Sequence, residues 1–136
     1  MKASLKRIVQ KRAKYCFEYC IAQERFAPDP FSSEHFIPIA KSGTDDAENL
    51  ALACQRCNNL KYIFTHSIDP ATGDIVPLYN PRKDDWLTHF HWDETFSYVL
   101  ANTPTGRATI VRLQLNRPSL VNLRRVFTPL GLHPPF

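Results

Sequence analysis

Short blocks of hydrophobic and polar residues follow one another along the chain, and the period of each block predicts its secondary structure. In residues 3–14, Leu5, Ile8 and Val9 fall on one stripe and basic residues on the other side, which predicts an amphipathic helix. Residues 107–115 alternate between the two classes, which is typical of a strand. The expected elements are a helix at 3–14, strands at 34–39 and 50–54 with one helical turn at 46–50, a helix at 56–64, strands at 95–100 and 107–115 forming a hairpin, and a helix at 118–127. This order predicts an α+β fold.

Length and composition limit the class of protein. The chain has 136 residues, of which 43% are hydrophobic and 22% charged, close to globular averages, so wholesale disorder is excluded. No apolar run approaches the roughly twenty residues of a membrane helix, and the N-terminus lacks the apolar stretch of a secretory signal. We therefore expect a soluble, cytoplasmic protein. The chain has four glycines and no Gly-rich phosphate-binding motif, which excludes nucleotide-fold enzymes.

Charge is distributed unevenly. Residues 1–14 contain six basic side chains and no acid, and the segment after Glu94 contains five arginines and no acid. All 13 acidic residues lie between these two basic flanks. Either flank alone is most simply a solvated helix face. Together, basic flanks around an acidic centre suit a protein that binds a polyanion and places carboxylates near it, so they favour nucleic acid as the partner.

Four cysteines form two close pairs, Cys16/Cys20 and Cys54/Cys57. Two pairs of thiolates are the ligand set that a tetrahedral structural zinc ion requires, because each pair can reach one ion from a single turn. Zinc would also help so small a core to fold.

Between and beside the two cysteine pairs lie residues that can carry chemistry: Glu34, His35, Asn49 and Asn58. Each has an ordinary structural explanation when taken alone. Together they place a carboxylate, an imidazole and two carboxamides in a region whose ends one metal ion could hold together.

The pattern Glu34-His-Phe-Ile-Pro38, Gly43, Asn49-Leu50, Cys54-x-x-Cys57-Asn58 and Lys61 resembles the HNH endonuclease family over about residues 15–61. The remainder resembles the C-terminal extension of small bacterial, often cyanobacterial, HNH proteins. That second resemblance rests on Asp69-Pro-x-Thr-Gly73, Pro81-Arg82, Trp86, His89-Phe90-x-Trp92, Thr103-Pro-x-Gly-Arg-Ala108 and Asn116-Arg117. We accordingly expect a basic N-terminal helix (1–14), an HNH core (15–66) and an extension packed on it (67–136).

The resemblance implies a ββα-metal fold and specific roles. His35 would be the general base that activates water, and Asn49 would brace the loop that orients it. Glu34 and Asn58 would hold one divalent cation, Mg²⁺ or Mn²⁺, with Ni²⁺ or Zn²⁺ as further possibilities. Neighbouring residues of a strand point to opposite faces, however, so Glu34 and His35 can share a site only if the strand twists.

The cysteine spacing departs from the family pattern. Relatives begin with Cys-x-x-Cys, whereas Phe17 stands at the expected first position here and Cys16 lies one residue earlier. Three arrangements remain open: Cys16 as the fourth ligand of zinc, a site of Cys20, Cys54 and Cys57 alone, or an empty site. We favour the first.

The resemblance implies metal-dependent hydrolysis of phosphodiester bonds in DNA, with double-stranded DNA as the expected partner. The side chains expected to bind nucleic acid are Lys61, Lys11, Arg12, Arg112 and Arg124. The alternative is a non-catalytic, zinc-stapled nucleic-acid-binding module derived from an HNH domain. A redox role for Cys54-x-x-Cys57 is a weaker third possibility, because no thioredoxin-like pattern surrounds the pair.

Overall fold

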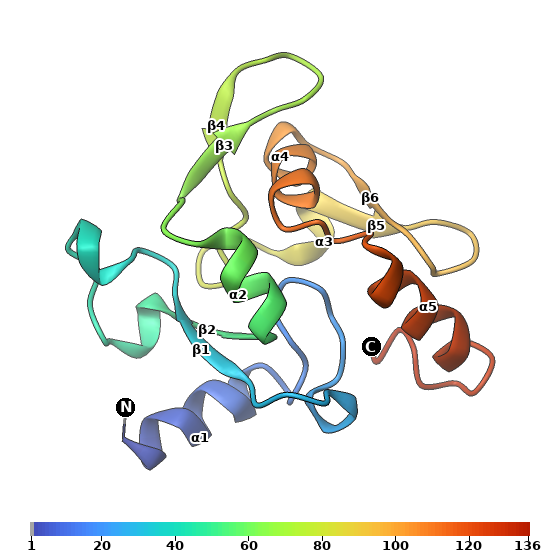
Figure 1. Cartoon of the computed structure of the whole chain (residues 1–136), viewed down its shortest axis with the longest axis horizontal. Helices are drawn as coiled ribbons and strands as arrows, with labels where there is room; N and C mark the ends of the chain where they lie inside the picture. Colours follow the sequence, from blue (N-terminus) through green and yellow to red (C-terminus); the bar gives the residue numbers. More distant parts are fainter. Residues whose placement is uncertain (1) are drawn as a thin grey trace. The chain divides into compact units, whose positions relative to one another are not determined.

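A computed structural model describes residues 2–136 (Figure 1). The helices are α1 (Ala3–Arg12), α2 (Gln55–Lys61), α3 (Trp86–His89), α4 (Pro104–Arg112) and α5 (Pro118–Phe127), with short 3-10 helices η1 (Glu24–Phe26), η2 (Ile39–Lys41) and η3 (Ala47–Asn49). The strands are β1 (Ser32–His35), β2 (Leu50–Ala53), β3 (His66–Ile68), β4 (Ile75–Pro77), β5 (Phe90–Trp92) and β6 (Val99–Ala101). The chain divides into two compact units, of which the first runs to Thr65 and includes Asn80–Lys83, and the second comprises His66–Tyr79 and Asp84–Phe136.

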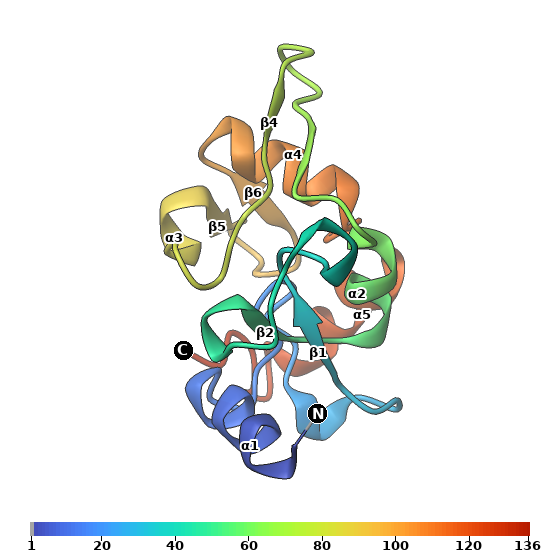
Figure 2. The same ribbon diagram turned by 90° about the vertical axis from the view of Figure 1, so that its left-hand side faces the viewer.

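The first unit is built on the antiparallel hairpin of β1 and β2, which pairs Ser32 with Ala53 and His35 with Leu50. All four residues of β2 are buried, so this strand is the centre of the unit's core. Helix α1 lies against β2 of the hairpin (Figure 2). Its Val9 has no exposed surface. Helix α2 lies beside β1. Its N-cap is Cys54, whose sulfur accepts a hydrogen bond from the Cys57 amide at 3.4 Å.

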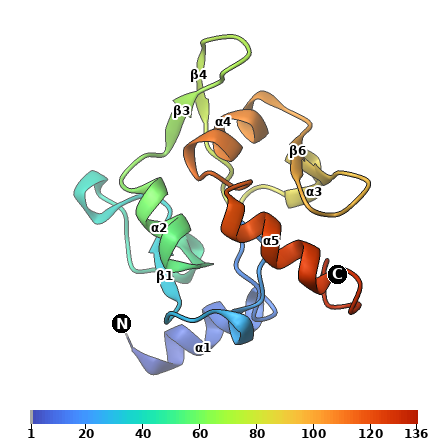
Figure 3. The ribbon, with the colours of Figure 1, turned by 45° about the vertical axis from the view of Figure 1, so that its right-hand side comes forward.

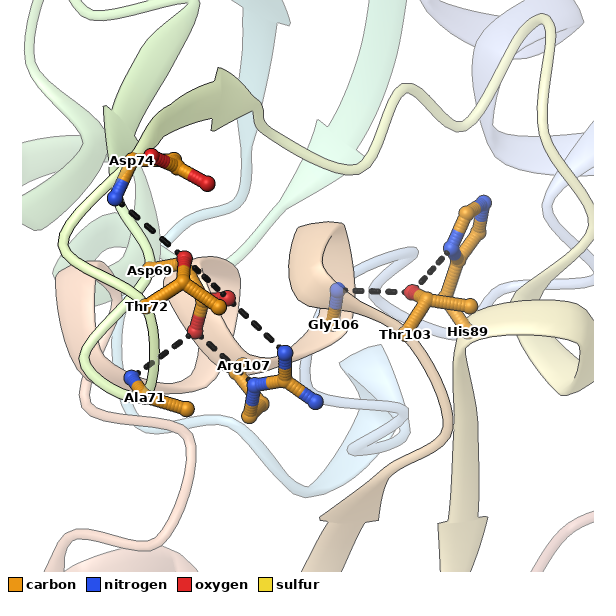
Figure 4. A network of polar contacts seen from close by, with 8 residues as sticks. All are labelled: Asp69, Ala71, Thr72, Asp74, His89, Thr103, Gly106 and Arg107. Carbon is orange, nitrogen blue, oxygen red and sulfur yellow. Dashed lines mark hydrogen bonds and ion pairs between the residues drawn. The ribbon is translucent and has the colours of Figure 1, made fainter.

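The second unit contains the hairpins β3–β4 and β5–β6, with α4 packed against both (Figure 3). Asp69, in the turn after β3, is fully buried and accepts two hydrogen bonds from Arg107 of α4, both of 2.8 Å (Figure 4). Thr103 caps α4 by accepting a hydrogen bond from the Gly106 amide at 3.0 Å and also contacts His89 Nδ1 at 2.6 Å. The Thr103 contacts fix the start of α4, and the Asp69–Arg107 pair joins α4 to the β3–β4 hairpin.

The α+β class expected from the sequence is confirmed, but the strand expected at 107–115 is wrong. Residues 104–112 form helix α4, and β6 pairs with β5 rather than with this segment. The helix is favoured over a strand because Thr103 supplies an N-cap and Pro104 is a favourable first residue. Ala108 and Leu113 are still buried in the core. The expected strand at 34–39 also ends early, at His35, because the chain turns at Pro38 into η2.

Among the described residues, no helix is both long enough and apolar enough to span a membrane.

Candidate functional site

His35 stands at the end of β1, with 27% of its side chain exposed. Its Nε2 lies 2.7 Å from Asp45 Oδ1, and a carboxylate in this position accepts the Nε2 proton. The described residues offer no partner to Nδ1, which is then the unprotonated nitrogen that can take up a proton. Asp45 was not expected from the sequence, since no spacing marks it among the other acids of this loop.

The loop that leads from His35 to Asp45 is held by Asn49. Its Oδ1 accepts a hydrogen bond from the Ile37 amide at 2.8 Å, while its Nδ2 donates to the carbonyls of Ile37 at 3.0 Å and Thr44 at 2.8 Å. Gly43 is pressed so closely on the loop that an added Cβ would lie 1.7 Å from the Ile37 carbonyl oxygen, so only glycine fits. The Asn49 side chain therefore closes the loop that brings Asp45 back to His35.

Glu34 points to the opposite face of β1 and is buried, with 3% of the residue exposed. Its carboxylate forms an ion pair of 2.6 Å with Lys61 Nζ and accepts a hydrogen bond of 2.7 Å from the Tyr19 hydroxyl. Burial lowers the pKa of Lys61 while Glu34 works against that shift, and burial next to Glu34 raises the pKa of Tyr19 well above its usual value.

Two predicted roles do not agree with this geometry. Lys61, expected to contact a phosphate, has no exposed surface, donates to the Phe36 carbonyl at 2.8 Å and serves as the structural partner of Glu34. The Glu34 carboxylate is committed to Lys61 and Tyr19, so Glu34 and Asn58 do not fit a shared divalent cation in this structure. Asn58 lies on α2 and is half-buried, and its carboxamide makes no hydrogen bond within the described residues.

Three of the four cysteines come together: the sulfur atoms of Cys20, Cys54 and Cys57 all lie within 4.8 Å of one another. The Cys20 thiol donates a hydrogen bond to the Cys54 sulfur at 4.0 Å. Hydrogen bonding with Cys54 and Cys57, together with burial, raises the pKa of the Cys20 thiol well above its usual value. A cation at the centre of the trio would reverse this by favouring thiolates, so the donor set fits zinc.

Cys16 lies outside this trio. Its sulfur donates to the Lys14 carbonyl at 3.5 Å, and burial raises the pKa of its thiol. Ile21, which directly follows Cys20, is β-branched and has a φ of 64°, a conformation that such residues rarely adopt. The structure thus supports the second of the three arrangements left open by the spacing.

The basic residues expected to bind nucleic acid differ in their surroundings. Lys11 is exposed on α1. Arg12 is half-buried and donates to the carbonyls of Ala47 at 2.9 Å and Leu50 at 2.7 Å. In the second unit, Arg112 is half-buried on α4, whereas Arg124 is 1% exposed and donates to backbone carbonyls, so it is a structural residue rather than a surface contact.

Comparison with protein families gives one match: the model of the HNH endonuclease family covers residues 16–62. Residues 16–62 are thus similar to an HNH domain. The matched segment includes the β1–β2 hairpin, α2 and the cysteine trio, so the resemblance inferred from the sequence is confirmed. No curated protein and no solved structure matches the chain. An HNH domain indicates a nuclease-type or nucleic-acid-binding function.

Proposed function

We propose that the protein is a metal-dependent endonuclease that hydrolyses phosphodiester bonds in DNA, with His35 as general base. The observation that carries the proposal is the partly exposed imidazole of His35, held by Asp45 through a loop that Asn49 closes. A general base needs a free nitrogen and a fixed orientation, and this arrangement supplies both.

The proton path follows from the geometry of the imidazole. His35 Nδ1 accepts a proton from the water that attacks phosphorus, and Nε2 keeps its own proton and donates it in a hydrogen bond to Asp45 Oδ1. The imidazolium that forms is stabilised by the Asp45 carboxylate 2.7 Å away. Asp45 is then a positioning residue, because it acts through His35. Cleavage by this route leaves 5′-phosphate and 3′-hydroxyl ends.

Metal ions enter the proposal at two places. A structural Zn²⁺ would be held by Cys20, Cys54 and Cys57, whose sulfur atoms lie within 4.8 Å of one another. A divalent cation, Mg²⁺ or Mn²⁺, would neutralise charge at the scissile phosphate when bound. Of the two expected ligands Asn58 remains available to it, whereas Glu34 belongs to the buried ion pair.

The substrate is proposed to be double-stranded DNA, bound through its phosphates. Of the two α1 residues expected to bind nucleic acid, Lys11 is the exposed one. A contact between a lysine and a phosphate does not depend on the base sequence of the DNA. Arg112 remains a candidate contact on α4 of the second unit.

The experiment is plasmid cleavage with added Mg²⁺ or Mn²⁺ by the wild type, His35→Ala and Asp45→Asn. His35→Ala should abolish cutting while far-UV circular dichroism stays unchanged. Asp45→Asn should lower kcat by about 10- to 100-fold with little change in KM, as expected when the partner that orients an imidazole is weakened. Normal cutting by His35→Ala would show that the base is wrongly assigned.

One observation favours a second function. The carboxylate that an HNH nuclease would offer to its cation is here paired with Lys61 and Tyr19, which suits a module that binds nucleic acid without cutting it. Binding of DNA without cleavage in Mg²⁺, Mn²⁺ and Ni²⁺ would support that function over the nuclease.

A further inference from the structure

An open hollow of about 630 Å³ lies in the first unit, between the end of α1 and η1. The proposed nuclease chemistry uses none of its lining residues, which are Gln10, Lys14, Tyr15, Gln23, Glu24 and Arg25. The volume is within the range of about 300–1,000 Å³ that small organic ligands occupy.

Two backbone segments form the walls of this hollow and are joined to each other. Cys16 and Gln23 make an isolated antiparallel bridge, and the Glu24 amide donates to the Tyr15 carbonyl at 2.9 Å. Lys14 and Tyr15 have φ values of 54° and 58°, a left-handed conformation that costs free energy for residues other than glycine. The backbone of Lys14 and Tyr15 is therefore strained, and the Tyr15 side chain is half-exposed.

The lining groups are those that recognise a nucleotide. Tyr15 offers an aromatic face to a base, and Lys14 and Arg25 offer cations to the flanking phosphates. Gln23 Oε1 accepts a hydrogen bond of 3.1 Å from Arg25 Nε, which orients the guanidinium. Gln10 Nε2 donates to Glu24 Oε1 at 2.8 Å, so a fixed amide and carboxylate stand at the polar side of the hollow.

We propose that this hollow binds one unpaired nucleotide of the nucleic-acid substrate, with its base stacked on Tyr15 and its phosphates near Lys14 and Arg25. The inference rests on the proposed function and narrows its double-stranded substrate to DNA with an unpaired nucleotide beside the duplex, as at a flap, a gap or a junction. A fully paired duplex keeps its bases stacked inside the helix and cannot place one on Tyr15.

The test measures binding of a short single-stranded DNA with one central 2-aminopurine, in buffer without added divalent cation. Stacking on Tyr15 should quench the 2-aminopurine fluorescence, and the same oligonucleotide in a perfect duplex should bind more weakly. Tyr15→Ala should weaken single-strand binding about tenfold or more and abolish the quenching, whereas Tyr15→Phe should bind within about twofold of the wild type, since the ring is kept. Arg25→Gln should lower the salt dependence of binding by about one phosphate contact.

Tyr62→Ala is the matched control. Tyr62 is also an exposed tyrosine of the first unit with a positive φ, 52°, but it does not line the hollow. Its replacement should leave single-strand binding unchanged, and circular dichroism of each variant establishes that it is folded.

Several results would overturn the inference: equal binding by Tyr15→Ala and the wild type, no preference for the single strand over the duplex, or equally tight competition by AMP, which would assign the hollow to free nucleotides. The outcome is separable from that of the proposed function. Plasmid cleavage with Tyr15-independent binding would refute only the nucleotide site. Tyr15-dependent single-strand binding without any cleavage would refute only the nuclease.

Discussion

Replacing Lys61 by methionine tests whether the residue is structural or contacts substrate. The side chain is fully buried and lies 2.6 Å from the Glu34 carboxylate, so Lys61→Met leaves a buried charge without its counter-ion and the Phe36 carbonyl without its donor. Removing one partner of a buried ion pair costs about 3–5 kcal/mol. With an m-value of about 2 kcal/mol/M, the urea midpoint should fall by about 2 M.

The measurement is urea unfolding at pH 7 followed by far-UV circular dichroism. The double variant Glu34→Gln/Lys61→Met should recover most of the lost stability, because no buried charge remains and the glutamine oxygen can still accept from the Tyr19 hydroxyl. Lys6→Met, which removes an exposed lysine of α1, is the control and should change stability by less than about 0.5 kcal/mol. An unchanged midpoint for Lys61→Met together with weaker DNA binding would refute the reasoning and return Lys61 to the phosphate-contacting role that its spacing suggested.

Three further predictions concern zinc and the second unit. Cys20→Ala should abolish zinc binding and Cys16→Ala should retain one zinc per chain, as measured by elemental analysis, because Cys16 lies outside the sulfur trio; loss of zinc from Cys16→Ala would contradict this. Arg124→Met should lower the free energy of unfolding by about 2–4 kcal/mol, because it leaves buried carbonyls without donors. It should not alter DNA affinity, and weaker DNA binding at unchanged stability would show that Arg124 contacts DNA instead. Hydrogen bonds from Arg107 hold the pKa of Asp69 below its usual range, so its contribution to stability is complete above about pH 4 and is lost as the pH falls toward the lowered pKa. Urea midpoints between pH 5 and pH 2 should therefore fall more steeply for the wild type than for Asp69→Asn, and parallel slopes would contradict the assignment.

Local signals in the sequence were sufficient for much of the HNH core. The Cys54-x-x-Cys57 pair opens a helix because the first cysteine caps it, and Asn49 closes a loop whose tightness also requires Gly43. These features depend on residues a few positions apart, where spacing determines geometry. The expected bracing role of Asn49 stays a prediction, but its three hydrogen bonds agree with it.

Other features depend on contacts that spacing alone does not determine. Adjacent strand residues face opposite sides, so Glu34 turns inward to Lys61 while His35 remains partly exposed. Asp45 reaches His35 only because the whole loop folds back. The segment 107–115 satisfies both a strand and a helix pattern, and its cap at Thr103 decides between them.

The central claim is tested most directly by cleavage of supercoiled plasmid with a protein sample whose zinc content has been counted. We predict one zinc per chain, nicking and linearisation stimulated by Mg²⁺ or Mn²⁺, and no cutting by His35→Ala at the same zinc content. DNA binding without cleavage in every metal, or equal cutting by His35→Ala, would contradict it.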